Sequence, residues 1–253
     1  MKILPPQTLP PGKPTTRRHQ PPASSHWSSY RACLRWDFGF TCALCLLHEA
    51  DLFGGQPGEG LGGTTVEHTI TRSEDVSKEN DYGNCLYACR FCNRSRSAKP
   101  AWRQGTRLLD PTRDAWSEHF WMSGDNLLPV QGNAEAEYTH EAYEIDDPRK
   151  VARRRARREL LTDRLRLLRL ESEIAKLLRL AGPLRQHDVR RFGEVVQQIR
   201  VIRTDARRAL GDLKRYSAIP VDAPQTCRCP LPREHSLPEE LDRQTVEVPG
   251  SVW

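Results

Sequence analysis

The sequence has no apolar run that approaches the roughly 18 residues of a membrane-spanning helix. It also lacks the apolar segment of a secretory signal peptide, because prolines interrupt its first stretch, MKILPPQTLPPGKPTTRRHQ. These absences argue against a membrane-spanning or secreted protein, and we expect a cytoplasmic one. Disulfides are rare in that reducing compartment, so the eight cysteines are expected to be metal ligands or buried thiols.

Negative charge is in the minority. Lys and Arg total 39 against 33 Asp and Glu, and the positive residues are clustered, most densely in RKVARRRARR at 149–158. A clustered positive excess favours a polyanionic partner, first of all nucleic acid. If 149–158 is helical, its charges lie on most sides of the helix, so the segment either contacts phosphates or is a solvated face. The sequence leaves both interpretations open.

Changes in composition divide the chain into four segments, and together these segments predict an α+β fold. Residues 1–28 are rich in Pro, Ser, Thr and Gln and are expected to form a disordered arm. Residues 29–147 contain six of the cysteines and short β-like runs, followed from 101 by an aromatic-rich stretch that suits a small helical extension packed on them. Residues 148–216 are expected to form a helical hairpin, and 217–253 a loosely ordered tail.

The hairpin prediction depends on apolar residues spaced three and four apart. The first helix is expected to open at Pro148 and to close at Gly182–Pro183, and the second to span Val189 to Tyr216. Further leucines lie off the main stripe of the first helix and predict a homodimer or a protein partner. The stripe residues are Leu167, Leu170, Ile174, Leu177 and Ala181, then Phe192, Val196, Ile199, Ile202, Ala206, Ala209 and Leu213; those off it are Leu161, Leu165, Leu168 and Leu180.

Two cysteine pairs give the strongest signal. The CxxC spacings of Cys42 with Cys45 and of Cys89 with Cys92 supply the four thiolates that a structural Zn²⁺ prefers. His48 is an alternative ligand, although a solvated loop histidine is the simpler interpretation. The other cysteines carry less information: Cys33 and Cys85 have no partner at ligand spacing, Cys85 is expected to be a small buried residue, and Cys227, Cys229 and His235 form too weak a pattern to interpret.

Polar residues flank these pairs in a recognisable order. The run VEHTITRS contains Glu67 and His68, Asn84 precedes the second cysteine pair, and Asn93 follows its last cysteine. This pattern resembles the HNH endonuclease family over about residues 36–100. The resemblance implies a small zinc-stapled ββα-metal core, in a metal-dependent DNA endonuclease that carries a helical C-terminal hairpin.

The resemblance also implies roles. His68 would be the general base, Glu67 and Asn93 would bind a catalytic Mg²⁺ or Mn²⁺, and Asn84 would hydrogen-bond across the hairpin and orient the loop that bears His68. Glu67 and His68 point to opposite faces of an ideal strand, so a twist or bulge is expected to bring the Glu67 carboxylate to the ion. The basic residues Arg94, Arg96 and Lys99 on the following helix are expected to contact DNA phosphates.

A second class of function fits the same residues. The chain could be a catalytically inactive zinc-containing module that binds nucleic acid or another protein. The feature that separates the two is whether Glu67, His68 and Asn93 surround one metal position. The glycine-rich loop 51–64 has neither phosphate-binding motif and is expected to be a flexible surface connection.

Overall fold

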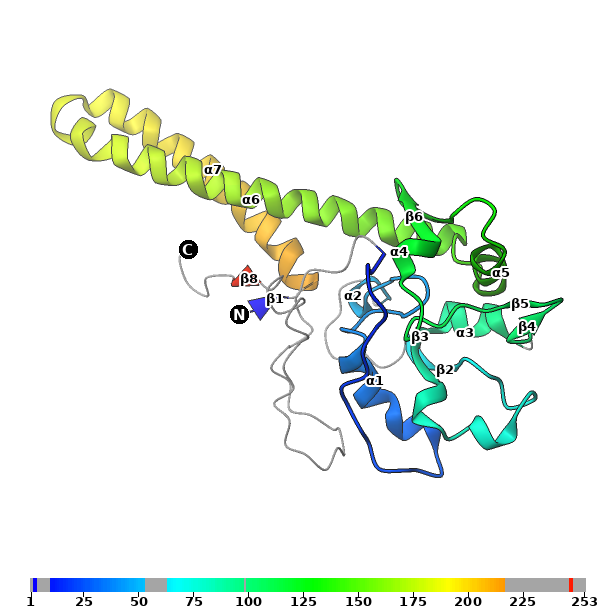
Figure 1. The fold of residues 1–253 in the computed structure, drawn as a ribbon. Helices are drawn as coiled ribbons and strands as arrows, with labels where there is room; N and C mark the ends of the chain where they lie inside the picture. Colours follow the sequence, from blue (N-terminus) through cyan, green and yellow to red (C-terminus); the bar gives the residue numbers. More distant parts are fainter. Residues whose placement is uncertain (1, 4–9, 53–62, 98, 217–245, 248–253) are drawn as a thin grey trace.

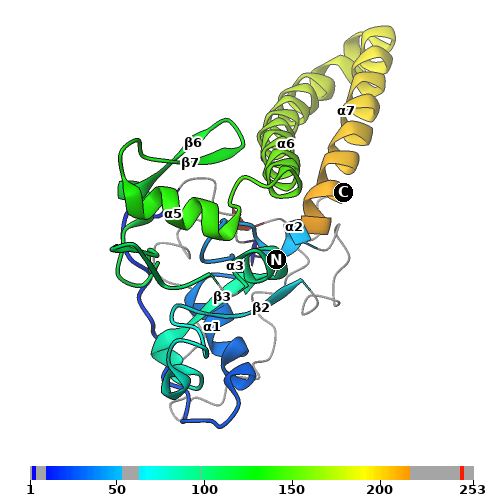
Figure 2. The same ribbon diagram turned by 90° about the vertical axis from the view of Figure 1, so that its right-hand side faces the viewer.

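The computed structural model of the chain describes residues 2–3, 10–52, 63–97, 99–216 and 246–247. It has an α+β fold in which small antiparallel sheets and short helices form one body, and a long helical hairpin projects from it (Figures 1 and 2). The predicted flexible loop at 51–64 and the cysteines at 227 and 229 lie mostly or wholly outside the described residues.

A strand–strand–helix unit lies at the centre of the body. Strand β2 (Thr64–His68) pairs antiparallel with β3 (Cys85–Cys89) in a continuous register that sets Thr64 opposite Cys89 and His68 opposite Cys85. Helix α3 (Arg90–Arg96) follows β3 without a linker. The first cysteine pair lies between α1 (Arg31–Asp37) and α2 (Glu49–Leu52). Three 3₁₀ turns complete this part, at Trp27–Tyr30, Val76–Lys78 and Tyr82–Asn84.

The described part of the N-terminal arm, residues 10–28, contacts the rest of the body. Arg17 donates to the carbonyl oxygens of Gly83 and Cys85, and the Nδ1 atom of buried His19 lies 2.7 Å from the Asp37 carboxylate. Polar contacts of this kind offset the ordering entropy that the arm's few apolar residues cannot. Lys2–Ile3 forms strand β1, which pairs with β8 (Val246–Glu247).

The segment from 101 to 147 is more β-rich than predicted. It contains two hairpins, β4 (Trp102–Arg103) with β5 (Thr106–Arg107) and β6 (Phe120–Ser123) with β7 (Asn126–Pro129), beside the helices α4 (Trp116–His119) and α5 (Ala134–Tyr143). The first hairpin turns at Gln104 and Gly105, whose φ angles of 53° and 82° suit a tight primed turn. The aromatic residues divide: Trp116 and Phe120 are core, whereas Trp102 and Trp121 are exposed.

The two long helices are α6 (Pro148–His187) and α7 (Val189–Tyr216), and they pack on each other as a hairpin (Figure 1). The predicted stripe is buried at Ile174, Ala181, Ile199 and Ala206. The prediction that α6 ends at Gly182–Pro183 is wrong: the helix continues through Pro183 and ends where Asp188 leaves helical geometry.

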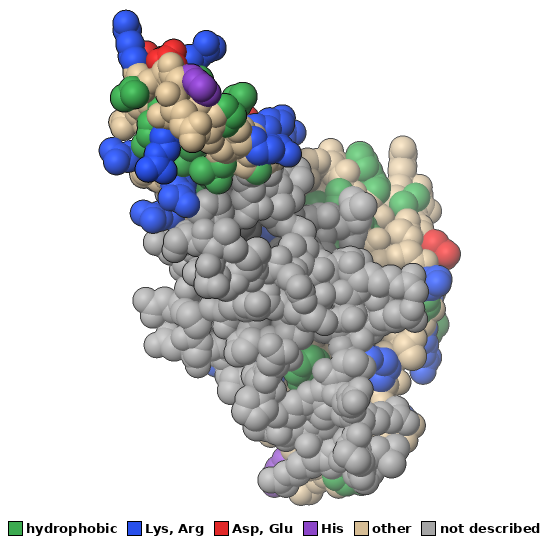
Figure 3. Space-filling view, turned by 90° about the vertical axis from the view of Figure 1, so that its left-hand side faces the viewer, with side chains coloured by type: hydrophobic (Ala, Val, Ile, Leu, Met, Phe, Trp, Pro, Cys, Tyr) green, Lys and Arg blue, Asp and Glu red, His purple; other side chains and the backbone are tan. Residues whose placement is uncertain are grey.

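The end of the hairpin is basic and partly apolar. Lys and Arg side chains surround exposed hydrophobic ones there (Figure 3), and the exposed apolar residues of the two helices include Leu178, Leu180 and Val201. The side chains of Leu161, Leu165 and Leu168 lie outside the described part of the structure. Association through this region stays a prediction.

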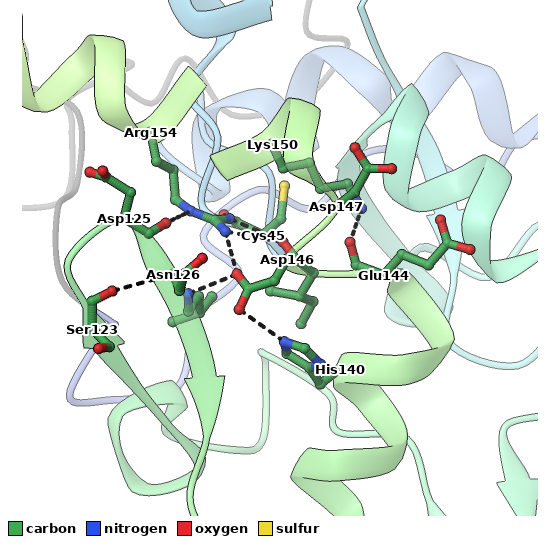
Figure 4. Close-up of polar contacts among 12 residues, drawn as sticks. Cys45, Ser123, Asp125, Asn126, His140, Glu144, Asp146, Asp147, Lys150 and Arg154 are labelled. Carbon is green, nitrogen blue, oxygen red and sulfur yellow. Dashed lines mark hydrogen bonds and ion pairs between the residues drawn. The ribbon is translucent and has the colours of Figure 1, made fainter. Parts of the chain in front are cut away.

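The basic segment at 149–158 divides between two faces of α6: Arg149, Arg155 and Arg158 are exposed, as a solvated face requires, but another face is not. Lys150, Arg154 and Arg157 are buried, so on this face the segment is part of the protein interior. Arg154 binds the Asp146 carboxylate at 2.5 Å and the carbonyl oxygens of Asp125, Ile145 and Cys45 (Figure 4). Arg157 binds Asp51 and the carbonyl oxygen of Leu46. The segment anchors the hairpin to the loop of the first cysteine pair.

This anchoring predicts a large loss of stability for Arg154→Ala. The variant would remove the cation that pairs with Asp146, whose side chain is 15% exposed, and the donor of three carbonyl groups; breaking a largely buried pair of this kind costs about 3 kcal/mol. Arg155→Ala is the matched control, because Arg155 is 60% exposed and reaches Asp125 only at 3.3 Å. Thermal unfolding of both variants checks the prediction. Equal melting temperatures would show that α6 is not held by this network.

Candidate functional site

The four cysteines of the two CxxC pairs meet at one point. Cys42, Cys45, Cys89 and Cys92 are fully buried, and their sulfur atoms all lie within 4.8 Å of one another. Within the described residues they are the only group of three or more His, Cys, Asp or Glu side chains close enough to share an ion. Two pairs separated by more than forty residues in sequence are thus brought together by the β2–β3 hairpin and α3.

The donor set fits zinc. The Sγ atoms of Cys45 and Cys89 are 3.6 Å apart, too far for a disulfide of about 2.05 Å. The spacing is near the edge of about 3.8 Å expected for a tetrahedron with Zn–S bonds of about 2.3 Å. The backbone N–H of Cys92 also donates to the Cys89 sulfur at 3.4 Å, where Cys89 caps α3. A bond of this kind stabilises a thiolate and fixes the start of the helix.

The remaining candidates are not part of this cluster. Cys33 and Cys85 are buried and lie outside the cluster, which confirms the prediction made for Cys85. His48 is not the solvated residue expected from the sequence: it is 3% exposed, and burial lowers its pKa to about 4. Its backbone N–H donates to Asp51 beside the arginines of α6.

Glu67 and Asn93 lie side by side. The Asn93 Nδ2 atom donates to Glu67 Oε2 at 2.8 Å, and the other carboxylate oxygen accepts the backbone N–H of His68 at 2.9 Å. Glu67 is buried, and this burial raises its pKa to about 7. The β2–β3 ladder is continuous through Glu67, so no bulge is needed to bring its side chain to α3. One carboxylate and one carboxamide thus meet between strand and helix.

His68 faces other neighbours. Its Nε2 atom lies 2.9 Å from the carbonyl oxygen of Glu79, and the ring of Trp27 stands edge-on to it with centroids 5.6 Å apart. A carbonyl oxygen can only accept, so Nε2 carries the hydrogen and Nδ1 keeps the lone pair of the neutral ring. Burial lowers the pKa of His68, which favours this neutral form. The structure joins His68 to Glu67 through its backbone, and gives no contact between its ring and Asn93.

Asn84 holds the loop that follows His68. Its side-chain oxygen accepts the N–H of Ile70 at 2.8 Å, and its Nδ2 atom donates to the carbonyl oxygens of Ile70 and Lys78. Its own carbonyl oxygen accepts the N–H of Thr69. One side chain therefore closes both ends of the loop, because it binds backbone just after His68 and just before Glu79.

The three basic residues predicted to contact DNA are in different environments. Arg94 is exposed and available. Lys99 donates to the carbonyl oxygens of Ala142 and Glu141 at the end of α5, where a cation suits the helix dipole. Arg96 is 0% exposed and donates to the carbonyl oxygen of Thr69 at 3.3 Å. Its side chain does not reach the surface, so the expected phosphate contact of Arg96 is replaced by one that supports the loop after His68.

Several residues of this region escaped the sequence analysis. Trp27 and the carbonyl of Glu79 fix the His68 ring, and Lys150 and Arg154 lie against the first cysteine pair. The contact with a backbone carbonyl leaves no signal in the sequence. The three cations could have been recognised, because Lys150, Arg154 and Arg157 are four and three residues apart, the spacing of one helix face.

Among the described residues, none of the helices is both long and apolar enough to cross a membrane. Comparison with protein-family models, curated proteins and solved structures finds no match to this chain.

Proposed function

We propose that the protein is a metal-dependent DNA endonuclease of the HNH type, in which β2, β3 and α3 form the ββα-metal core. The observation that carries the proposal is the contact of Glu67 with Asn93 across that unit, directly beside His68 and next to a cluster of four cysteines. Those three residues lie in the order and on the elements that the family resemblance implies.

In this proposal His68 removes a proton from the attacking water. The Glu79 carbonyl holds Nε2–H, so Nδ1 is the atom that accepts the proton as the water oxygen bonds to phosphorus and the bridging P–O bond breaks. Asn84 and Arg96 bind the backbone of the loop that contains Thr69 and Glu79 and hold it in place. Because the Glu79 carbonyl is fixed, the imidazole ring is already oriented for catalysis before substrate binds.

Glu67 and Asn93 would hold the catalytic Mg²⁺ or Mn²⁺. A carboxylate and a carboxamide are oxygen donors suited to a hard ion, and a site with two protein ligands leaves room for water and phosphate. Asn93 would turn its amide oxygen towards the ion in place of the nitrogen that now faces Glu67. The ion would stabilise charge on the phosphate and the leaving oxygen. Asn93 is held in position because the neighbouring Cys92 belongs to the cysteine cluster.

Two basic features support DNA as the polyanionic partner of the protein: the exposed Arg94 and the basic end of the hairpin. The alternative is an inactive zinc-containing module that binds nucleic acid or protein. It requires the same cysteine cluster and the same basic surface, and it makes no use of a Glu67–Asn93 contact. That contact is the specific reason for preferring the enzyme.

Asn93→Ala tests the ion site. We expect the Mg²⁺ concentration for half-maximal plasmid cleavage to rise about tenfold or more, because one lost interaction with a charge is worth about 1.5–3 kcal/mol. Asn126→Ala on β7 is the control, since Asn126 binds only the carbonyl oxygen of Ser123 among its described contacts. Zinc content is measured in parallel. A variant with an unchanged Mg²⁺ requirement would remove Asn93 from the proposed ion site.

A further inference from the structure

Lys150 is an unusual residue in the first turn of α6. Its side chain is 0% exposed, and its Nζ atom donates to the carbonyl oxygens of Tyr143 at 2.5 Å and Glu144 at 2.9 Å. Both acceptors are neutral. Both carbonyls lie at the C-terminal end of α5, where the helix dipole supplies only about half a negative charge. A buried ammonium is costly unless a full negative charge compensates it, so these contacts account for only part of the compensation that Lys150 needs.

The other buried cations on this face of α6 have carboxylate partners. Arg154 pairs with Asp146, and Arg157 pairs with Asp51. Asp147 is a nearby carboxylate, but Arg149 binds both of its oxygens, at 2.7 and 2.9 Å, so Asp147 is already paired with another cation. Lys150 therefore differs from its neighbours, because its hydrogen bonds within the described part of the chain go to carbonyl groups alone.

The cysteine cluster is the negative charge that lies against this face. Arg154, one turn after Lys150, donates to the carbonyl oxygen of Cys45 at 3.2 Å, and Arg157 donates to that of the adjacent Leu46. Figure 4 shows Cys45 in the same group of side chains as Lys150 and Arg154. The Tyr143 residue that Lys150 binds belongs to the same buried core as all four cysteines, so the ammonium and the cysteine cluster share one interior shielded from water.

We propose that Lys150 is the counter-charge of the metal centre: its buried ammonium offsets the negative charge of four thiolates around one zinc ion. Such a centre carries about two net negative charges, and it is shielded from water here because all four cysteines are fully buried. The ammonium lowers the cost of keeping these thiolates ionised. It thereby tightens zinc binding and links the start of α6 to the centre. This role rests on the zinc site and is independent of the nuclease proposal.

The test compares zinc affinity in purified full-length variants by competition with a chromophoric chelator. Lys150→Gln keeps N–H donors for the two carbonyl groups and removes the charge, and Lys150→Met is a second neutral variant. We expect both to bind zinc about 10–100-fold more weakly, the range for residues that support metal ligands. Lys150→Arg keeps the charge and should stay within about threefold of the natural protein. Lys176→Gln, at an exposed position of α6, is the control.

A second readout separates charge from general destabilisation. With Co²⁺ in place of zinc, the thiolate-to-metal absorption band should shift in the neutral variants and stay in place in Lys150→Arg and Lys176→Gln. Neutral variants that bind zinc within about twofold of the natural protein would overturn the proposal. An arginine variant that loses zinc as strongly as the neutral ones would overturn it too, because charge would then not be the property that matters.

Discussion

Replacing His68 by alanine is expected to lower the rate of metal-dependent DNA cleavage about 10²–10⁴-fold, the usual contribution of a general base. The loss follows from the position of the ring, whose Nε2–H is held by the Glu79 carbonyl and whose Nδ1 is the basic atom. Zinc content and melting temperature should change little, because His68 lies at the end of β2 and is only half-buried. Initial rates of plasmid nicking at saturating Mg²⁺ measure the effect.

The control for this experiment is His187→Ala. His187 is exposed in the last turn of α6, so its loss should leave cleavage unchanged. Both variants are purified by the same protocol, and a contaminating nuclease would then give equal activity in both. A His68→Ala protein that cleaves as fast as His187→Ala would exclude His68 as the base.

Replacing Cys92 by serine is the second change with a large expected effect. Structural zinc contributes about 10–16 kcal/mol of apparent binding free energy in small zinc units, as much as the whole stability of a typical domain of about 5–15 kcal/mol. Losing one of four ligands should release the ion and unfold the body around β2, β3 and α3. Metal analysis and circular dichroism measure both outcomes.

Cys33→Ser and Cys85→Ser are controls for the cysteine experiment, because both thiols are buried and neither belongs to the cluster. They test whether the loss of any buried thiol has the same effect. We expect both control proteins to keep one zinc per chain. A Cys92→Ser protein with full metal content and a native spectrum would refute the four-cysteine assignment.

The parts of the structure that the sequence could predict depend on short spacings. A CxxC pair needs only one turn of chain to place two sulfurs together, and the short β-like runs TTVEH and CLYAC are enough to predict two strands. The stripe from Ile174 to Ala181 is similarly local, since helical periodicity alone brings those residues to one face. Each of these features depends only on residues that are close together in the sequence, so the sequence alone can predict it.

The parts that could not be predicted depend on distant partners. A run of arginines is usually solvated, and within 149–158 Arg154 and Arg157 are buried only because Asp51, Asp146 and the loop of the first cysteine pair supply acceptors. Arg17 and His19 order the N-terminal arm in the same way, through groups at Asp37 and Gly83 that the arm's composition does not reveal. Arg96 looked like a surface residue because neighbouring positions of α3 are polar, yet the Thr69 carbonyl holds it inside.

If Glu67, His68 and Asn93 form the catalytic site of a nuclease, DNA cleavage must depend on both His68 and an added ion. Zinc-loaded natural protein is incubated with supercoiled plasmid, with and without added Mg²⁺ or Mn²⁺, beside His68→Ala at equal zinc content. We expect nicked or linear plasmid only when the natural protein and an added ion are both present. Plasmid that stays supercoiled under every ion, with zinc bound and the fold intact, would exclude the nuclease and favour the inactive binding module.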